Sequence, residues 1–286
     1  MTTKTGTEIN VNYVDTVGFG ADVGGRGFHL PVDLSVRSDG RVFVINRSPM
    51  HRRGIRVGIC DVAHGWYGEF GSDGKGDGQF TSPTAITHGP DDRVYVADEE
   101  LNRITVYTPD GEYESKWGEV GSAPGQIHGP SALKFTAEGD LLVVDHQNHR
   151  VQRYTTDGEF VSSFGTRGKS QAEFDLPWGV DVGPDGAIYV ADWQNNRVQI
   201  LSADGRFVAQ LRGDHVLSQW GREKLVSNPD MLRQRAIAFA NDSGTFEREF
   251  AQPCAVKIDN QGRLVVVENW SGRIQVYQKT KEPMLV

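Results

Sequence analysis

A unit that opens on a proline recurs five times along the 286 residues of the chain, and no other feature restricts the possible folds as strongly. Each unit begins with a Phe or Ile three positions before its proline. The prolines are Pro31, Pro83, Pro130, Pro177 and Pro253. Two successive intervals, from Pro83 to Pro130 and from Pro130 to Pro177, have the same length. A fixed period of this kind is typical of repeat architectures such as solenoids and propellers.

Each unit has the pattern of four short strands. An alternating run follows the proline, a glycine-containing turn comes next, and the second strands read VFVIN, VYVAD, LLVVD, IYVAD and LVVVE. The third run begins at Ile55, Ile104, Val151, Val198 or Ile274, and the fourth run ends in FG, WG, FG or LR. The 34 glycines, about 12% of the chain, suit an architecture with many tight turns. Four antiparallel strands per unit describe a β-propeller blade, so we predict an all-β propeller.

The number of blades and the closure of the ring depend on two irregular regions. Five prolines indicate five blades, with six as the alternative because the interval from Pro177 to Pro253 is much longer than the two regular intervals. Residues Asn10 to Gly18 look like a fourth strand with no strands before them, whereas the last unit ends after three. We therefore expect this N-terminal strand to close the last blade, within one domain that spans residues 1–286.

The long interval before Pro253 predicts a helical insertion at about 214–249. Asn228 is a suitable N-cap, and Pro229 suits the first position of a helix. The insertion connects a fourth strand to the next first strand, so we expect it on the face around the mouth of the channel. There it would form a lid, or a helical support for the rim or an oligomer contact.

Three copies of a short motif carry a family resemblance. The sequence reads NHRVQ at 148–152, NNRVQ at 195–199 and GRIQV at 272–276. This pattern resembles the NHL-repeat family, and the resemblance implies a propeller of four-stranded blades. One branch of similar proteins, the peptidyl-hydroxyglycine amidating lyases, implies a metal at the channel mouth held by histidines from several blades.

Composition and charge exclude several classes of protein. A formal net charge of −8 and a pI near 5.5 argue against nucleic-acid binding, which needs a basic surface. No signal-peptide core and no apolar run of about 18 residues is present, so we expect a cytoplasmic protein without membrane association. Cys60 and Cys254 lie far apart in sequence and predict neither a disulfide framework nor a cysteine-rich zinc site.

The position two residues before each proline suggests a metal site. Its occupants are His29, Thr81, His128, Asp175 and Ala251. In a propeller these positions belong to loops that converge on the channel mouth, and imidazole with carboxylate suits a divalent metal. We therefore identify His29, His128 and Asp175 as candidate ligands of one zinc, iron, manganese or calcium ion; the alternative is a structural role for each histidine.

The residues that follow the second strands suggest a ligand pocket on the same face. They are Arg47, Glu99, His146, Trp193 and Asn269. Trp178 and Trp193 would form an apolar wall, and Glu99 and His51 would add polar contacts, although the tryptophans could instead pack between blades. The preceding aspartates are expected to bond backbone groups or the repeat arginines; these pairs are Asp98 with Arg103, Asp145 with Arg150, and Asp192 with Arg197.

One residue departs from the repeat near the axis. The other copies carry Ala or Gly at the second position after the proline, whereas the first copy carries Asp33. A carboxylate in a crowded place needs a hydrogen-bond partner or a cation. We identify Asp33, His146 and Arg47 as candidate catalytic residues. Asp33 or the histidine would act as an acid or base, and the arginine would hold an anionic group of the ligand. The alternative is a buried ion pair between Asp33 and an arginine.

These observations favour a small-molecule enzyme or binder with a metal-capable polar pocket at the channel mouth. Lyase or hydrolase chemistry would fit, because a bound ion polarises a substrate oxygen or activates water. The alternative is a non-catalytic NHL scaffold that grips a protein or peptide on its top face. The expected partner is a small molecule in the central channel; the oligomeric state stays open.

Overall fold

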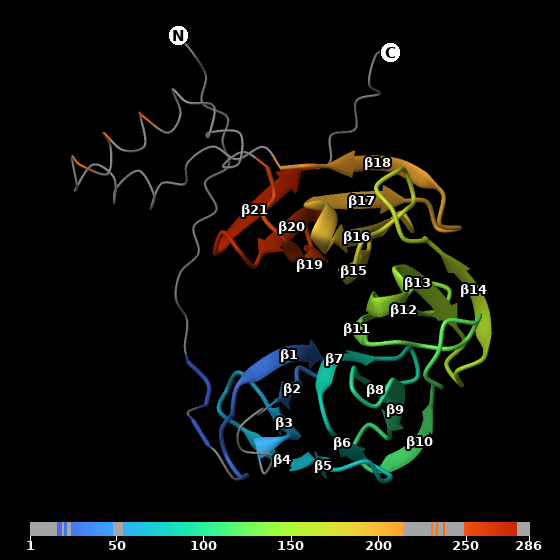
Figure 1. Cartoon of the computed structure of the whole chain (residues 1–286). Coiled ribbons are helices and arrows are strands. Elements are labelled where there is room, and N and C mark those ends of the chain that lie inside the picture. Colours follow the sequence, from blue (N-terminus) through green and yellow to red (C-terminus); the bar gives the residue numbers. More distant parts are fainter. Residues whose placement is uncertain are drawn as a thin grey trace.

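The computed structural model describes residues 16–18, 20–21, 24–47, 54–213 and 249–278, together with positions 230, 233 and 237. These residues form a ring of antiparallel sheets, each of which is one blade (Figure 1). The first blade contains β1 (Pro31–Val36), β2 (Val42–Asn46), β3 (Arg56–Cys60) and β4 (Trp66–Phe70). The second contains β7 (Pro83–His88), β8 (Val94–Asp98), β9 (Arg103–Tyr107) and β10 (Tyr113–Trp117).

The remaining blades repeat this order. The third contains β11 (Pro130–Phe135), β12 (Leu141–Asp145), β13 (Arg150–Tyr154) and β14 (Phe160–Phe164). The fourth contains β15 (Pro177–Val182), β16 (Ile188–Asp192), β17 (Arg197–Leu201) and β18 (Phe207–Leu211). The fifth contains β19 (Pro253–Ile258), β20 (Arg263–Glu268) and β21 (Arg273–Gln278). A two-stranded parallel connection, β5 (Ser72–Asp73) with β6 (Gln79–Phe80), precedes the second blade. The prediction of a five-bladed all-β propeller is confirmed.

Every inner strand begins at a repeat proline, as the sequence predicts. In all five blades the pairing with the second strand shifts by one residue directly after the proline. Proline cannot donate a hydrogen bond to the ladder, so the first position of a strand and a β-bulge are the places in a sheet where it is tolerated. The recurrent proline therefore marks the point at which each chain segment turns from a loop into the inner wall of the ring.

Each third strand begins one residue away from its predicted start. In the first blade, the alignment of this strand with the other copies was also wrong. The sequence pattern aligned Ile55 with Ile104, but in the structure Asn46 pairs with Arg56 as Asp98 pairs with Arg103. Arg56 is thus the repeat arginine of the first blade, and Val57 is the equivalent of Ile104. The connection between the second and third strands is longer in the first blade than in the others because of the residues at 48–53. The start of the third strand could therefore not be located by counting from the second.

The hydrophobic core lies between neighbouring blades. The inner strands β1, β7, β11, β15 and β19 follow one another around the centre (Figure 1). Buried side chains of each blade pack against those of the next, as Val144 and Val151 of the third blade do with Val180 and Val190 of the fourth. Because the sheets of the second, third and fourth blades are covered on both faces, their second strands are almost unbroken apolar runs rather than alternating ones.

Two expected features fall on residues that the structure does not describe. The N-terminal strand was predicted over Asn10 to Gly18, of which only residues 16–18 are described, and the fifth blade has three strands in the described part of the chain. The helical insertion at about 214–249 also lies mostly outside the described residues; positions 230, 233 and 237 within it are helical. Among the residues described, no helix is long and apolar enough to cross a membrane.

Candidate functional site

A recurrent hydrogen bond fixes the loops that precede the inner strands. In each blade, the backbone N–H two residues before the proline donates to the polar side chain that ends the second strand. These bonds are His29 to Asn46 (2.7 Å), Thr81 to Asp98 (2.7 Å), His128 to Asp145 (2.6 Å), Asp175 to Asp192 (2.7 Å) and Ala251 to Glu268 (2.7 Å). The backbone of each candidate metal ligand is therefore held by the repeat, and only its side chain differs between blades.

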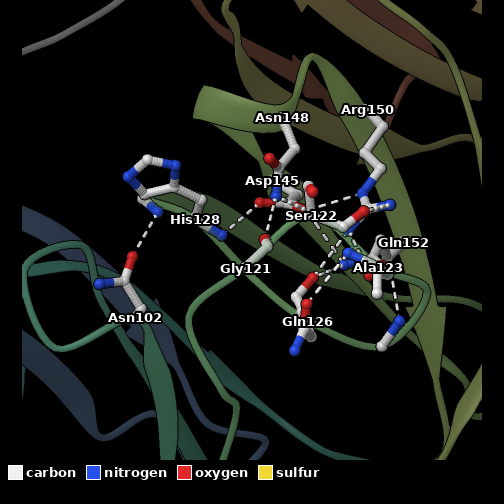
Figure 2. A network of polar contacts seen from close by, with 12 residues as sticks. Asn102, Gly121, Ser122, Ala123, Gln126, His128, Asp145, Asn148, Arg150 and Gln152 are labelled. Carbon is white, nitrogen blue, oxygen red and sulfur yellow. Dashed lines mark hydrogen bonds and ion pairs between the residues drawn. The ribbon is translucent and has the colours of Figure 1, made fainter.

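The acidic residue at the end of the second strand organises a buried polar network, shown for the third blade in Figure 2. There Asp145 Oδ2 accepts hydrogen bonds from Arg150 Nε (2.8 Å), Asn148 Nδ2 (2.9 Å) and Gln152 Nε2 (3.1 Å). Arg150 also donates to the backbone carbonyls of residues 122, 123 and 126 in the preceding connection. A buried charge needs such full pairing, so the predicted structural role of this aspartate is confirmed.

The equivalent residues of the fourth blade repeat the network, and those of the second blade do not. Asp192 Oδ2 accepts from Arg197 Nε at 2.7 Å. Asp98 instead accepts four backbone N–H groups, from residues 81, 82, 100 and 101. The nearby Arg103 bonds backbone carbonyls, and its Nε has no hydrogen-bond partner among the described residues.

A cavity of about 480 Å³ opens where the loops of the second and third blades meet. It brings together four of the predicted site residues, Glu99, His128, His146 and Trp178. The other lining residues are Ser82, Glu100, Asn102, Gly129 and Gln147. The lining residues are mostly polar, and the indole of Trp178 adds an apolar surface. Ligand pockets are usually more apolar than this, and it is their polar groups that fix the orientation of a small molecule. We refer to this cavity as the mouth pocket.

His146 is the most constrained side chain of the mouth pocket. It begins a short 3₁₀ turn (His146–Asn148) and is buried. Its Nδ1 lies 2.9 Å from the carbonyl oxygen of Pro177 in the next blade. A carbonyl can only accept, so Nδ1 carries the proton and Nε2 is the unprotonated nitrogen of the neutral ring. Burial lowers the pKa of His146, which keeps the ring neutral at neutral pH.

Trp178 and Trp193, which the sequence predicted as an aromatic wall, both pack on His146. The ring of Trp178 meets that of His146 edge to face at 4.7 Å, and Trp193 lies 6.3 Å from it. The two indoles are 5.9 Å apart. Trp178 lines the mouth pocket, whereas Trp193 contacts the rings of Trp178 and His146 without lining it. Both predicted roles, ligand wall and interblade packing, are thus compatible with the arrangement.

Arg47 reaches the pocket only through Glu99. Arg47 Nη2 lies 2.5 Å from Glu99 Oε1, and Ser82 Oγ donates to the same oxygen at 3.1 Å. The Glu99 carboxylate is therefore held in place at the wall of the pocket, while the arginine side chain is occupied by this pair. An arginine engaged in this way is a positioning residue for Glu99 rather than a free clamp for an anionic ligand.

Asp33 lies in the channel, apart from the mouth pocket. Its Oδ2 accepts the backbone N–H of Ile86 in the second blade at 2.9 Å. Burial raises the pKa of Asp33, and the charge of Lys257 across the channel opposes part of that rise. The predicted alternative, a buried pair between Asp33 and an arginine, is not seen among the described residues, where a backbone amide of the next blade bonds the carboxylate instead.

The three predicted metal ligands do not form a group. Among the described residues, no cluster of three or more His, Cys, Asp or Glu side chains could hold a metal ion. His128 lines the mouth pocket, whereas His29 and Asp175 belong to other blades and do not line it. Asp175 instead lies 3.2 Å from His149 Nδ1.

That contact is not an ion pair. His149 Nδ1 accepts the backbone N–H of Leu176 at 3.0 Å, so it carries no proton. Burial also lowers the pKa of His149. The ring is therefore neutral at neutral pH, and its nitrogen cannot donate to Asp175.

One predicted residue is not described, and four polar pocket residues were missed. His51 lies outside the described part of the chain. Ser82, Glu100, Asn102 and Gln147 line the mouth pocket without having been predicted. A signal existed for Ser82, because the position directly before the proline holds Leu, Gly, Leu and Gln in the other copies and a hydroxyl only here. Glu100 gave no such signal, since it follows Glu99 in a loop and continues no repeat pattern.

Comparison with known proteins supports the fold. Residues 174–201 match the family described as NHL repeat, which confirms an NHL-type propeller repeat in the fourth blade. No curated protein shows significant sequence similarity to the chain.

Several solved structures share the architecture. A streptogramin B lyase is 14% identical with a TM-score of 0.51, and the match covers 94% of this chain and 88% of the lyase. A chain from a nidogen/laminin complex is 14% identical with a TM-score of 0.56, and the match covers 87% of this chain and 75% of that one. A Bacteroides thetaiotaomicron protein of unknown function is 20% identical with a TM-score of 0.57, covering 85% of this chain and only 58% of its own length. Similarity at these identities shows the fold alone.

Proposed function

We propose that the mouth pocket binds a small polar organic molecule and that His146 acts there as a general base. The observation that supports this most directly is the geometry of the His146 ring. Its Nδ1–H is used by the Pro177 carbonyl, which leaves the lone pair of Nε2 for a ligand. The lowered pKa keeps this nitrogen unprotonated at neutral pH, as a base requires.

The neighbouring groups suit either of two reactions. In a lyase reaction, Nε2 would take a proton from a carbon next to a carbonyl group, and a leaving group would depart from the adjacent carbon. In hydrolysis, Nε2 would take a proton from a water molecule that attacks a carbonyl carbon. Glu99 can stabilise the imidazolium that forms in either reaction, because its charge already favours protonation of His146. Trp178 would hold an apolar part of the substrate against the pocket wall.

The comparisons support the fold on which this proposal rests, and the suggestion of lyase chemistry comes from structural neighbours of low sequence identity. Streptogramin B lyase has the same architecture at 14% identity. A specific amidating-lyase activity has less support, because His29 and Asp175 do not join His128 in the mouth pocket. A divalent metal stays a prediction, and elemental analysis of protein purified without a histidine tag tests it.

His146→Asn tests the proposal. The Asn amide N–H can still donate to the Pro177 carbonyl, but the variant has no basic nitrogen. Parent and variant would be incubated with a pool of small carboxylic acids, amides and cyclic esters, and substrate loss would be followed by mass spectrometry. We expect turnover by the parent and a loss of about 100-fold or more in the variant, the usual contribution of a general base. His64→Gln, at an exposed loop of the first blade, serves as the control and should retain full activity.

The competing function, a scaffold for a protein or peptide, gives a different outcome. A scaffold would show no turnover of the pool, and its partner would be captured equally by the parent and by His146→Asn. Equal turnover by the parent and His146→Asn would also contradict the proposal, because another group would then supply the base.

A further inference from the structure

The lining of the mouth pocket contains two carboxylates and no fixed cation. Glu99 and Glu100 follow the second strand of the second blade, and both line the pocket. Among the described residues of the lining there is no lysine and no arginine. Two carboxylates in succession at this point occur only in the second blade, because the other copies carry at the position of Glu100 the residues Ser48, Gln147, Gln194 and Trp270.

Glu99 keeps one carboxylate oxygen for a ligand. The hydrogen bonds from Arg47 and Ser82 both go to Oε1, and no described residue donates to Oε2. Arg47 is not one of the residues that line the pocket. It therefore orients the carboxylate and offsets part of its charge from outside the lining, while Oε2 can accept a hydrogen bond from within the pocket.

Most hydrogen-bond donors of the pocket are engaged within the protein. Ser82 Oγ donates to Glu99 at 3.1 Å, and Asn102 Nδ2 donates to a backbone carbonyl at 3.1 Å. The Nδ1–H of His146 is used by a carbonyl of the next blade. The groups left at the wall are acceptors, namely Glu99 Oε2, the Glu100 carboxylate and His146 Nε2. Two other lining side chains can donate as well as accept, His128 and Gln147.

His146 shows that this surplus of acceptors reaches a buried group. The residue is 7% exposed and lines the pocket, and its Nε2 has no hydrogen-bond partner among the described residues. A buried polar atom without a partner is costly, so such atoms are normally satisfied by protein, water or a ligand. A ligand that brings donors into the pocket suits its wall better than one that brings acceptors.

Trp178 supplies a surface that favours a positive charge. Its indole lines the pocket and meets the ring of His146 at 4.7 Å between centroids. The face of an aromatic ring carries partial negative charge, and indole attracts cations more strongly than the other aromatic side chains. The carboxylates and the indole therefore favour the same kind of ligand.

An organic cation fits these groups better than a metal ion does. Within the described part of the chain, no three His, Cys, Asp or Glu side chains are placed to hold a metal. The cavity of about 480 Å³ is also much larger than a single ion. An ammonium group on an organic molecule would use the carboxylates, the indole and the volume together.

We propose that the ligand of the mouth pocket carries a protonated amine, which donates to Glu99 Oε2 and lies against the indole of Trp178. This inference rests on the proposed function, because it assigns a ligand class to the same pocket. The remainder of the ligand then extends toward His146 Nε2, where the proton transfer would occur. The sequence suggested the opposite charge, with Arg47 holding an anionic group, but Arg47 is bound to Glu99.

Matched probes of one carbon skeleton test the charge of the ligand. They are 2-phenylethylamine, the neutral 2-phenylethanol and the anionic 3-phenylpropionate, with butylamine, 1-butanol and pentanoate as a second set without the ring. Ligand-observed NMR titrations of the parent protein at neutral pH give each Kd. In at least one set we expect an amine Kd of about 1 mM or lower, a range accessible to molecules of this size. The amine should bind about tenfold more tightly than its two analogues, because a hydrogen bond to a charged group contributes about this factor.

Three substitutions locate the effect. Glu99→Gln keeps the shape of the side chain and removes its charge, so amine affinity should fall about tenfold while alcohol affinity stays unchanged. Glu100→Gln should have a smaller effect because its carboxylate is exposed to solvent. Glu112→Gln is the control, since it removes the same charge in the turn between β9 and β10, at the other end of these strands, and should leave amine affinity unchanged.

Three results would overturn the inference. They are alcohol or carboxylate binding as tight as that of the amine, no amine binding at about 1 mM in either set, and equal losses in Glu99→Gln and Glu112→Gln. Failure of the proposed function looks different. Amine binding without turnover of any substrate would overturn the role of His146 as a base and support this inference. Turnover that depends on His146 without any preference for amines would do the reverse.

Discussion

The third and fourth blades have nearly the same scaffold and different side chains at the channel mouth. Asp145 with Arg150 and Asp192 with Arg197 make equivalent ion pairs and fix the same loop. At the mouth, His128 and His146 of the third blade correspond to Asp175 and Trp193 of the fourth. Residues that recur therefore hold the blade together, and the candidate chemistry lies at positions where the copies differ.

This division between scaffold and mouth has a physical basis. The recurring carboxylates and arginines are buried, and each needs all of its partners because an unpaired buried charge is costly. His128 is exposed and Trp178 is partly exposed, so both can be replaced without leaving buried groups unsatisfied. The comparison can be tested by substitutions on each side of the division.

The largest expected effect is that of Asp192→Ala. Arg197, which is 1% exposed, would lose its carboxylate, and three other donors would lose their acceptor. Breaking a buried pair in this way costs about 3–5 kcal/mol of the free energy of unfolding. The matched variant His128→Ala removes an exposed side chain and should cost about 0.5 kcal/mol or less. The free energy of unfolding of both variants would be measured in urea. Equal losses of this free energy in Asp192→Ala and His128→Ala would contradict the division between scaffold and mouth.

A smaller effect concerns the pH dependence of stability. Because burial lowers the pKa of His146, the unfolded chain binds this proton more readily than the folded protein does. Stability from the neutral ring is complete above the ordinary histidine pKa of about 6.5 and is lost as the pH falls below it. His146→Asn lacks this titration, so its stability should fall less steeply between about pH 7 and pH 5. Parallel curves for the two proteins would show that the ring is not desolvated.

The smallest expected effect is that of Glu99→Gln on stability. Glu99 and Arg47 are both partly exposed, with side-chain exposed fractions of 31% and 33%. Such a pair contributes about 0.2–1 kcal/mol, and salt screens it. The difference in melting temperature between parent and variant should therefore shrink in about 1 M NaCl. A loss of several kcal/mol would place Glu99 in the scaffold instead of the pocket wall.

Much of the fold could be predicted because its signals are local. Each proline begins an inner strand, and each aspartate of the second strand bonds the backbone or an arginine as expected. The error in the first blade came from the extra residues at 48–53, which displaced Arg56 from its place in the alignment. Periodicity identifies strands reliably, but it cannot place an element once an insertion interrupts the count.

The candidate site was predicted less completely because it depends on contacts between blades. Glu99, His128, His146 and Trp178 share one cavity although they come from three blades. Arg47 and Asp33 are satisfied by Glu99 and by the Ile86 amide, which are 52 and 53 residues away in sequence. Equivalent positions in a repeat predict which face a residue occupies, but not whether two side chains on that face meet.

The repeat spacing alone specifies the blades, their strand order and the residues that hold each loop. These features depend on interactions within one unit and the connection next to it, and such interactions recur in every copy. The mouth pocket depends on how the blades are placed around the centre. His146 illustrates the difference: its position in a turn follows from the sequence, whereas its tautomer is set by a carbonyl of the next blade. Packing between blades therefore converts a repeated scaffold into one asymmetric site.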